Sequence, residues 1–198
     1  VAKATGQPLA KIATRLMAGE TLQSVGLQRE PQPPLQTIKE AVLPFRRFPG
    51  ADTVLGPEMR STGEVMGSAD NFGMAYAKAE LGAGEALPTS GTVFLSTHDR
   101  DKPALVPVAA RLIELGFDLI ATSGTASALD RAGLNVRSVL KVHEGRPNIE
   151  DLIRSKQVQL VINTPIGRQA AYDDRYLRRA ALDYAVPTVT TLAGARAA

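Results

Sequence analysis

The stretch Thr92-Val93-Phe94-Leu95-Ser96 decides the fold, because it opens a regular alternation of apolar strands and amphipathic helices that runs to the end of the chain. Strands are predicted at 92–96, 118–121, 136–141, 159–162 and 188–190, and helices at about 102–115, from 125, at 148–154 and at 172–184. Five strands separated by helices are typical of a parallel sheet covered on both faces. The sequence therefore predicts an α/β domain over residues 92–198, built on a doubly wound five-stranded parallel sheet.

Residues 1–85 follow a different pattern. Apolar residues recur at helical spacing from Leu9 to Met17, residues 38–43 resemble a strand, and residues 71–81 resemble a helix. Irregular stretches separate these segments, and the periodic apolar sequence is too sparse for a good independent core. We therefore expect a mixed α+β region that forms the tail of a larger domain.

Residues 86–91, which contain Pro88 and Gly91, read as a linker between these two regions. The chain starts at Val1 without an initiator Met, and we expect it to be a piece of a longer protein.

The composition excludes several kinds of chemistry. The 198 residues include no Cys, so disulfides, a thiolate nucleophile and a zinc–thiolate site are excluded, and the two His are too few for a histidine-rich metal centre. The net charge of +3 is a weak field, and aromatic residues make up only 5% of the chain, which argues against nucleic-acid binding. No apolar run approaches the roughly 18 residues of a membrane span. We expect a cytoplasmic protein without nucleic-acid or membrane partners.

Polar side chains follow the predicted strands. In an open α/β sheet, ligands bind outside the carboxyl ends of the strands, where helix N-termini offer free N–H groups. The candidates at these ends are Ser96, Lys102, Thr122, Thr125, Lys141, Asn163 and Thr164. Hydroxyls, an amide and two lysines suit a phosphate, and we expect no carboxylate among them.

The turn Thr122-Ser123-Gly124-Thr125 is the sharpest motif of this set. Gly124 allows a close approach of the backbone to a ligand, and Thr125 can cap the following helix. The same turn could be a cap without a ligand, but Lys102, Lys141 and Asn163 at the same edge favour a site. The predicted role is to bind a phosphorylated metabolite rather than to transform it.

No catalytic residue is predicted. His143 could be a general base, but no partner is evident, and a loop histidine held by hydrogen bonds is the favoured interpretation. Asp173 and Asp174 could be catalytic carboxylates or metal ligands, yet a place near the start of the last helix is favoured. Arg175, Arg178 and Arg179 share one helix face, which is usually solvated.

Three motifs resemble a known family. Gly56-Pro57-Glu58-Met59-Arg60-Ser61-Thr62-Gly63-Glu64-Val65-Met66-Gly67 resembles the end of the carbamoyl-phosphate-forming half of carbamoyl-phosphate synthase large chains. Lys141-Val142-His143-Glu144-Gly145-Arg146-Pro147 and Ile162-Asn163-Thr164 resemble their C-terminal allosteric domain, which has the methylglyoxal-synthase-like fold. The resemblance runs essentially from end to end of the chain, and it makes residues 1–85 the tail of an ATP-grasp domain.

The resemblance implies a parent enzyme that is an ATP-dependent ligase. It makes carbamoyl phosphate from bicarbonate, glutamine-derived ammonia and two ATP, for arginine and pyrimidine synthesis. The ATP and Mg (or Mn) sites should lie upstream of this segment, which should bind no cofactor and be non-catalytic. A glutaminase small chain is the implied partner in a hetero-oligomer. Nucleotide effectors such as UMP or IMP should bind through the residues that match Lys102, Thr122, Thr125, Lys141, Asn163 and Thr164.

The sequence also departs from the family. Ornithine is held in well-known bacterial members by a glutamate that matches Glu40 and by a Tyr-Asp-Thr run that here reads Thr188-Val189-Thr190. Glu40 and Thr190 are therefore a possible remnant of an ornithine site. Pro165 stands where the family has a second threonine, which removes an N–H donor.

Two other functions are alternatives to the binding of a regulatory phosphorylated metabolite. A free-standing lyase acting on a triose phosphate would have the same fold, but it needs carboxylates beside the phosphate. A receiver-like signalling module would need an acidic pair after the first strand and an Asp at the end of the third, where Ser96-Thr97 and Lys141 stand instead.

Overall fold

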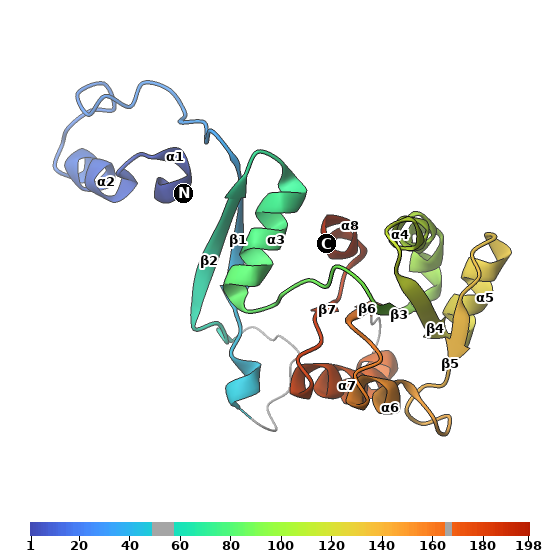
Figure 1. The fold of residues 1–198 in the computed structure, drawn as a ribbon. Helices are drawn as coiled ribbons and strands as arrows, with labels where there is room; N and C mark the ends of the chain where they lie inside the picture. Colours follow the sequence, from blue (N-terminus) through green and yellow to red (C-terminus); the bar gives the residue numbers. More distant parts are fainter. Residues whose placement is uncertain (49–57, 165–167) are drawn as a thin grey trace.

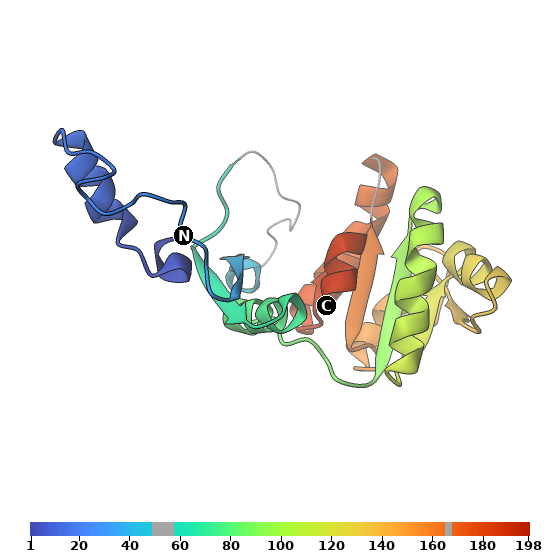
Figure 2. The same ribbon diagram turned by 90° about the horizontal axis from the view of Figure 1, so that it is seen from above.

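The computed structural model describes residues 1–48, 58–164 and 168–198. In these ranges the chain forms two parts, a five-stranded sheet with helices on both faces and a smaller N-terminal part that extends away from it (Figures 1 and 2). Pro165 and the first two residues of the motif at 56–67 lie outside the described residues.

The central sheet is parallel, as predicted. Its strands, in the spatial order β5-β4-β3-β6-β7, are β5 (Arg137–Val139), β4 (Asp118–Thr122), β3 (Thr92–Thr97), β6 (Leu160–Thr164) and β7 (Thr188–Val189). The central strand β3 has Val93, Phe94 and Leu95 almost fully buried. A continuous apolar run of this kind is what a strand covered on both faces requires.

Two apolar cores cover the two faces of the sheet. Val93 and Leu95 pack against α4 (Lys102–Glu114), α5 (Ser123–Arg131) and α8 (Leu192–Ala197), whereas Phe94 packs against α6 (Ile149–Arg154) and α7 (Arg168–Asp183). Successive side chains of β3 thus point to opposite faces. The doubly wound prediction is confirmed.

Some predicted boundaries were wrong. Strand β5 ends at Val139 instead of 141, because Leu140 leaves the ladder and pairs with Asn148 as an isolated bridge. Helix α5 begins at Ser123, before Thr125, and α7 begins at Arg168. The short helix α8 was not predicted, because six residues that include Gly194 are too few to show a helical period.

The N-terminal part contains two short helices and a small two-layer unit. Its elements are α1 (Ala2–Thr5), α2 (Leu9–Met17), β1 (Gln36–Val42), the 3-10 helix η1 (Phe45–Arg47), β2 (Gly63–Ala69) and α3 (Phe72–Ala83). Strands β1 and β2 pair antiparallel. Helix α3 packs on them at Gly67, where a Cβ would collide with the Ala75 carbonyl. The glycines at 63 and 67 concealed β2 from the sequence, because Gly is rare in strands.

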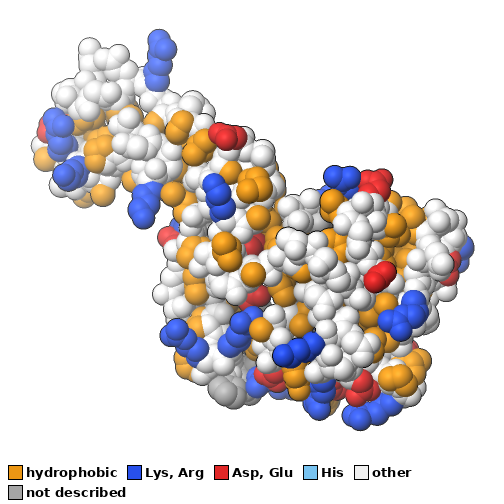
Figure 3. All heavy atoms as spheres, viewed as in Figure 1, with side chains coloured by type: hydrophobic (Ala, Val, Ile, Leu, Met, Phe, Trp, Pro, Cys, Tyr) orange, Lys and Arg blue, Asp and Glu red, His pale blue; other side chains and the backbone are white. Residues whose placement is uncertain are grey.

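Contacts of α3 with α8 and of η1 with α7 join the two parts. None of the helices in the described ranges has both the length and the apolar character needed to cross a membrane. On the face shown in Figure 3, Lys and Arg side chains are scattered among Asp and Glu side chains.

Candidate anion-binding site

The predicted polar residues meet at the carboxyl edge of the central strands. Ser96 lies beside Asn163 in the β3–β6 register, and Thr97 lies beside Thr164. Thr122 ends the neighbouring strand β4 on the other side of β3. The structure therefore brings together the residues that sequence spacing assigned to three separate strands.

Thr125 links these strand ends through its hydroxyl. Its Oγ1 accepts a hydrogen bond from the Thr97 N–H (3.3 Å) and another from the Thr122 hydroxyl (3.2 Å), and the residue is 1% exposed. A hydroxyl has two acceptor positions and one proton. Both acceptor positions are filled, so Thr125 can only donate to a further partner.

The start of α5 differs from the prediction in one respect. Thr122 is the residue before the helix, its side chain makes no cap hydrogen bond, and Thr125 lies inside the first turn. The N–H groups of this turn therefore remain without a side-chain cap from Thr122. Such groups carry partial positive charge and favour an anion.

Lys102 brings a full positive charge to the same helix end. Its side chain is 18% exposed, and its Nζ lies 3.2 Å from the position that a Cβ on Gly124 would occupy. Gly124 belongs to the first turn of α5. An ammonium and a helix N-terminus repel each other, so an anion placed between them is stabilised by both.

Asp99 supplies one such negative charge. Its Oδ1 lies 2.6 Å from Lys102 Nζ, and the hydrogen bond from Lys102, followed by its charge, holds the pKa of the Asp99 carboxyl below its usual value. Asp174 of α7 takes a similar place on Asn163, whose Nδ2 donates to Asp174 Oδ2 (3.1 Å) and to the Ser96 carbonyl (3.4 Å). The prediction that this edge lacks carboxylates was therefore wrong.

The reason for that error is positional. Asp99 lies two residues past the end of β3, and Asp174 lies in the second turn of α7. Neither residue directly follows a strand. The prediction that Asp174 lies near the start of the last helix was also wrong, because α7 begins six residues earlier.

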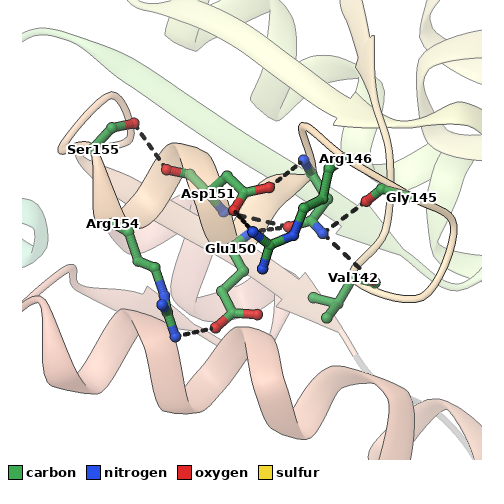
Figure 4. A network of polar contacts seen from close by, with 8 residues as sticks. Val142, Gly145, Arg146, Glu150, Asp151, Arg154 and Ser155 are labelled. Atoms are coloured by element: carbon green, nitrogen blue, oxygen red, sulfur yellow. Dashed lines mark hydrogen bonds and ion pairs between the residues drawn. The ribbon is translucent and has the colours of Figure 1, made fainter.

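Lys141 stands on a loop that Asn148 holds in shape. Figure 4 shows how Val142 and Gly145 of this loop lie beside Glu150 and Asp151 of α6. Asn148 Nδ2 donates to the carbonyls of Gly145 (2.8 Å) and Val142 (3.3 Å), while its Oδ1 accepts from the Glu150 and Asp151 N–H groups. Asp151 Oδ2 in turn accepts from the Asn148 N–H, which completes a capping box. These hydrogen bonds fix the loop to the start of α6. Lys141 is exposed on this loop, two residues after Val139, which pairs with Thr122 in the β4–β5 register.

The other predicted residues lie elsewhere. His143 is exposed on the same loop. Arg178 is 9% exposed, so the prediction of a solvated face is wrong for this residue because α7 packs that position inward. Among the described residues, no group of three or more His, Asp or Glu side chains is arranged to hold a metal ion.

Glu40 and Thr190 belong to a second region, where α3 meets α8. Glu40 lies half-buried on β1, and burial, followed by the charge of Glu80, raises the pKa of its carboxyl. Burial, followed by a hydrogen bond with Glu80, also raises the pKa of the Tyr76 hydroxyl, which lies 3.7 Å from the Cβ position of Gly194 in α8. Thr190 is exposed directly before the cap of α8.

Known proteins match the sequence. A family model described as the MGS-like domain matches residues 104–190, so the class of the central sheet domain is MGS-like. The carbamoyl phosphate synthase large chains of Nostoc sp., Synechocystis sp. and Pseudomonas aeruginosa are 57%, 58% and 52% identical to it over 100% of this chain.

The chain is therefore similar over its whole length to carbamoyl phosphate synthase large chains, and it spans 18% of the length of these relatives. Among solved structures, a methylglyoxal synthase from Elizabethkingia anophelis is 23% identical with a TM-score of 0.46, covering 56% of this chain and 77% of that one.

Proposed function

We propose that residues 92–198 bind a phosphorylated nucleotide, such as UMP or IMP, and regulate carbamoyl phosphate synthesis by the protein of which they are part. The observation that carries this proposal is the convergence of the Lys102 ammonium and the uncapped first turn of α5 on one point beside buried hydroxyls. Two positive groups held together need an anion, and a phosphate supplies both charge and several acceptor oxygens.

The residues have distinct roles in this proposal. Lys102 provides the full charge, and the first turn of α5 provides N–H donors to the phosphate oxygens. The Thr125 hydroxyl, with both acceptor positions filled, donates its proton. Lys141 closes the site from the loop that Asn148 fixes, and Ser96, Thr122, Asn163 and Thr164 form its floor.

The parent activity follows from the family. We infer an ATP-dependent ligase that uses bicarbonate, glutamine-derived ammonia and two ATP, with Mg or Mn, in the cytoplasm, together with a glutaminase small chain. An effector regulates such an enzyme by binding two of its states with different affinity, and a typical coupling free energy is about 1–3 kcal/mol.

Calorimetric titration of the chain with UMP, IMP, ornithine and dihydroxyacetone phosphate tests the proposal. We expect a nucleotide to bind and Lys102→Ala to weaken its affinity by about 10- to 100-fold, the usual effect of losing a hydrogen bond to a charged group. Lys39→Ala is the matched control, because Lys39 is exposed on β1 and pairs with Glu64.

Two results would contradict the proposal. One is equal nucleotide affinity in the wild type and in Lys102→Ala. The other is conversion of dihydroxyacetone phosphate to methylglyoxal, which would favour the lyase.

A further inference from the structure

We propose that Asp99 and Asp174 are internal counter-anions of the phosphate site, which occupy Lys102 and Asn163 in the ligand-free protein and are displaced when a phosphate monoester binds. This inference rests on the proposed function. It adds two residues that set the affinity of the site without contacting the bound phosphate.

The case for Asp99 is its unequal pairing with Lys102. The Lys102 side chain is 18% exposed and held against α5, whereas the Asp99 side chain is 87% exposed and joined to the lysine by a 2.6 Å contact. Among the described residues, Lys102 forms the ion pair of the Asp99 carboxylate, and the charge of His98 adds a smaller effect that also lowers the pKa of Asp99. The carboxylate can therefore leave for solvent at small cost while the ammonium stays in place.

The case for Asp174 is the buried amide that it engages. Asn163 is 1% exposed, and its two amide hydrogens point to Ser96 O and Asp174 Oδ2. Its Oδ1 has no hydrogen-bond partner among the described residues. An amide whose donors are both occupied cannot serve a phosphate oxygen, so a ligand that uses Asn163 must take the place of the Asp174 carboxylate.

The consequence is a built-in reduction of affinity. The site binds a ligand only in the fraction of molecules whose carboxylates have left, and the apparent dissociation constant rises by the inverse of that fraction. The arrangement also pairs the partly buried Lys102 ammonium with a carboxylate. A ligand with several charged oxygens replaces both carboxylates at once.

Substitution by the isosteric amides tests the inference for each residue with UMP and with inorganic phosphate as the probes. We expect Asp99→Asn to tighten binding by about two- to five-fold, which is the strength of an exposed ion pair. Asp101→Asn is the control, since Asp101 is the next acidic residue and pairs with Arg100 instead of Lys102. If the lost negative charge acted only through the general electrostatic field, both variants would bind the ligand more tightly. If Asp99 is a displaced counter-anion, only Asp99→Asn binds it more tightly.

Asp174→Asn, which retains an acceptor but loses the charge, should also tighten binding. Its control is Asp183→Asn on the same helix, where Asp183 pairs with Arg179. If neither Asp99→Asn nor Asp174→Asn binds more tightly than its control, while Lys102→Ala still weakens UMP binding, the counter-anion inference is wrong and the phosphate site stands.

A second measurement, which needs no ligand, distinguishes failure of the counter-anion inference from failure of the proposed function. Carbon-detected NMR titration of Asp99 should give a pKa below the usual value in the free protein, and Lys102→Ala should return it toward that value. A normal Asp99 pKa in the wild type would overturn the pairing itself. If the pairing is found but the wild type and all four aspartate variants fail to bind UMP, IMP and phosphate, the proposed function is wrong and this inference falls with it.

Discussion

At the scale of single residues, the chain carries backbone strain after α7. Ala185 has φ 58°, in the left-handed region, and the N–H groups of Ala185 and Val186 close the end of the helix onto the carbonyls of Leu182 and Ala181. This position usually belongs to Gly, because a Cβ costs about 1–2 kcal/mol there.

Replacing Ala185 with Gly should therefore stabilise the protein. The relief of strain exceeds the extra chain entropy of Gly, about 0.5–1 kcal/mol, so we expect a gain of roughly 0.5–1 kcal/mol in the free energy of unfolding. Denaturant unfolding measures it. Ala132→Gly is the control, since Ala132 caps α5 with φ −88° and should lose stability. A loss in both variants would disprove the strain.

At the scale of elements, one polar side chain joins the loop after β5 to helix α6. Asn148→Ala removes both donations to the loop carbonyls and the side-chain cap of α6. We expect a loss of about 1–2 kcal/mol in the free energy of unfolding. Because Lys141 is then held less firmly, the affinity for UMP should also fall by about two- to ten-fold.

Asn71→Ala separates these two effects. Asn71 caps α3, a helix of the N-terminal part, through a hydrogen bond from the Met74 N–H. It should lose stability and leave UMP affinity unchanged. Equal losses of affinity in both variants would show that Asn148 acts through stability alone.

The sequence was sufficient for the elements whose apolar pattern is strong. Strands β3, β4 and β6 are buried on both faces and read as apolar runs, and their carboxyl ends placed Thr122, Asn163 and Thr164 correctly. Strand β2 was missed because glycines at 63 and 67 serve the approach of α3, a tertiary need that no local pattern shows.

The site was predicted less completely than the fold. A search for polar residues directly after each predicted strand cannot find Asp99 and Asp174. These two residues reach the carboxyl edge of the sheet from turns further along the chain. Asn148 was missed for a similar reason, since its contacts depend on the path of a loop. Long-range side-chain pairing of this kind follows from the folded backbone and not from spacing.

At the scale of the whole molecule, the junction between the N-terminal part and the sheet domain holds several carboxyl groups in half-buried positions. Burial is the main cause that raises the pKa of both Glu40 and Glu85. The charge of Glu80 raises both pKa values further, whereas the charge of Arg46 lowers that of Glu85. The Tyr76 hydroxyl connects this group to α8. The junction therefore favours protonated carboxyls.

This arrangement predicts how stability depends on pH. A carboxyl group whose folded pKa is raised binds more protons in the folded state than in the unfolded state, so the free energy of unfolding falls as pH rises through the range from the unfolded pKa to the folded one. Above that range the destabilisation is complete and constant, so stability should increase as pH is lowered from 7 through this range. Glu40→Gln should raise stability at pH 7 and flatten the dependence. Glu64→Gln, on the exposed opposite face of the same two strands, should leave it unchanged. Thermal unfolding from pH 7 to pH 5 measures both, and an unchanged slope in Glu40→Gln would rule out this carboxyl as the source.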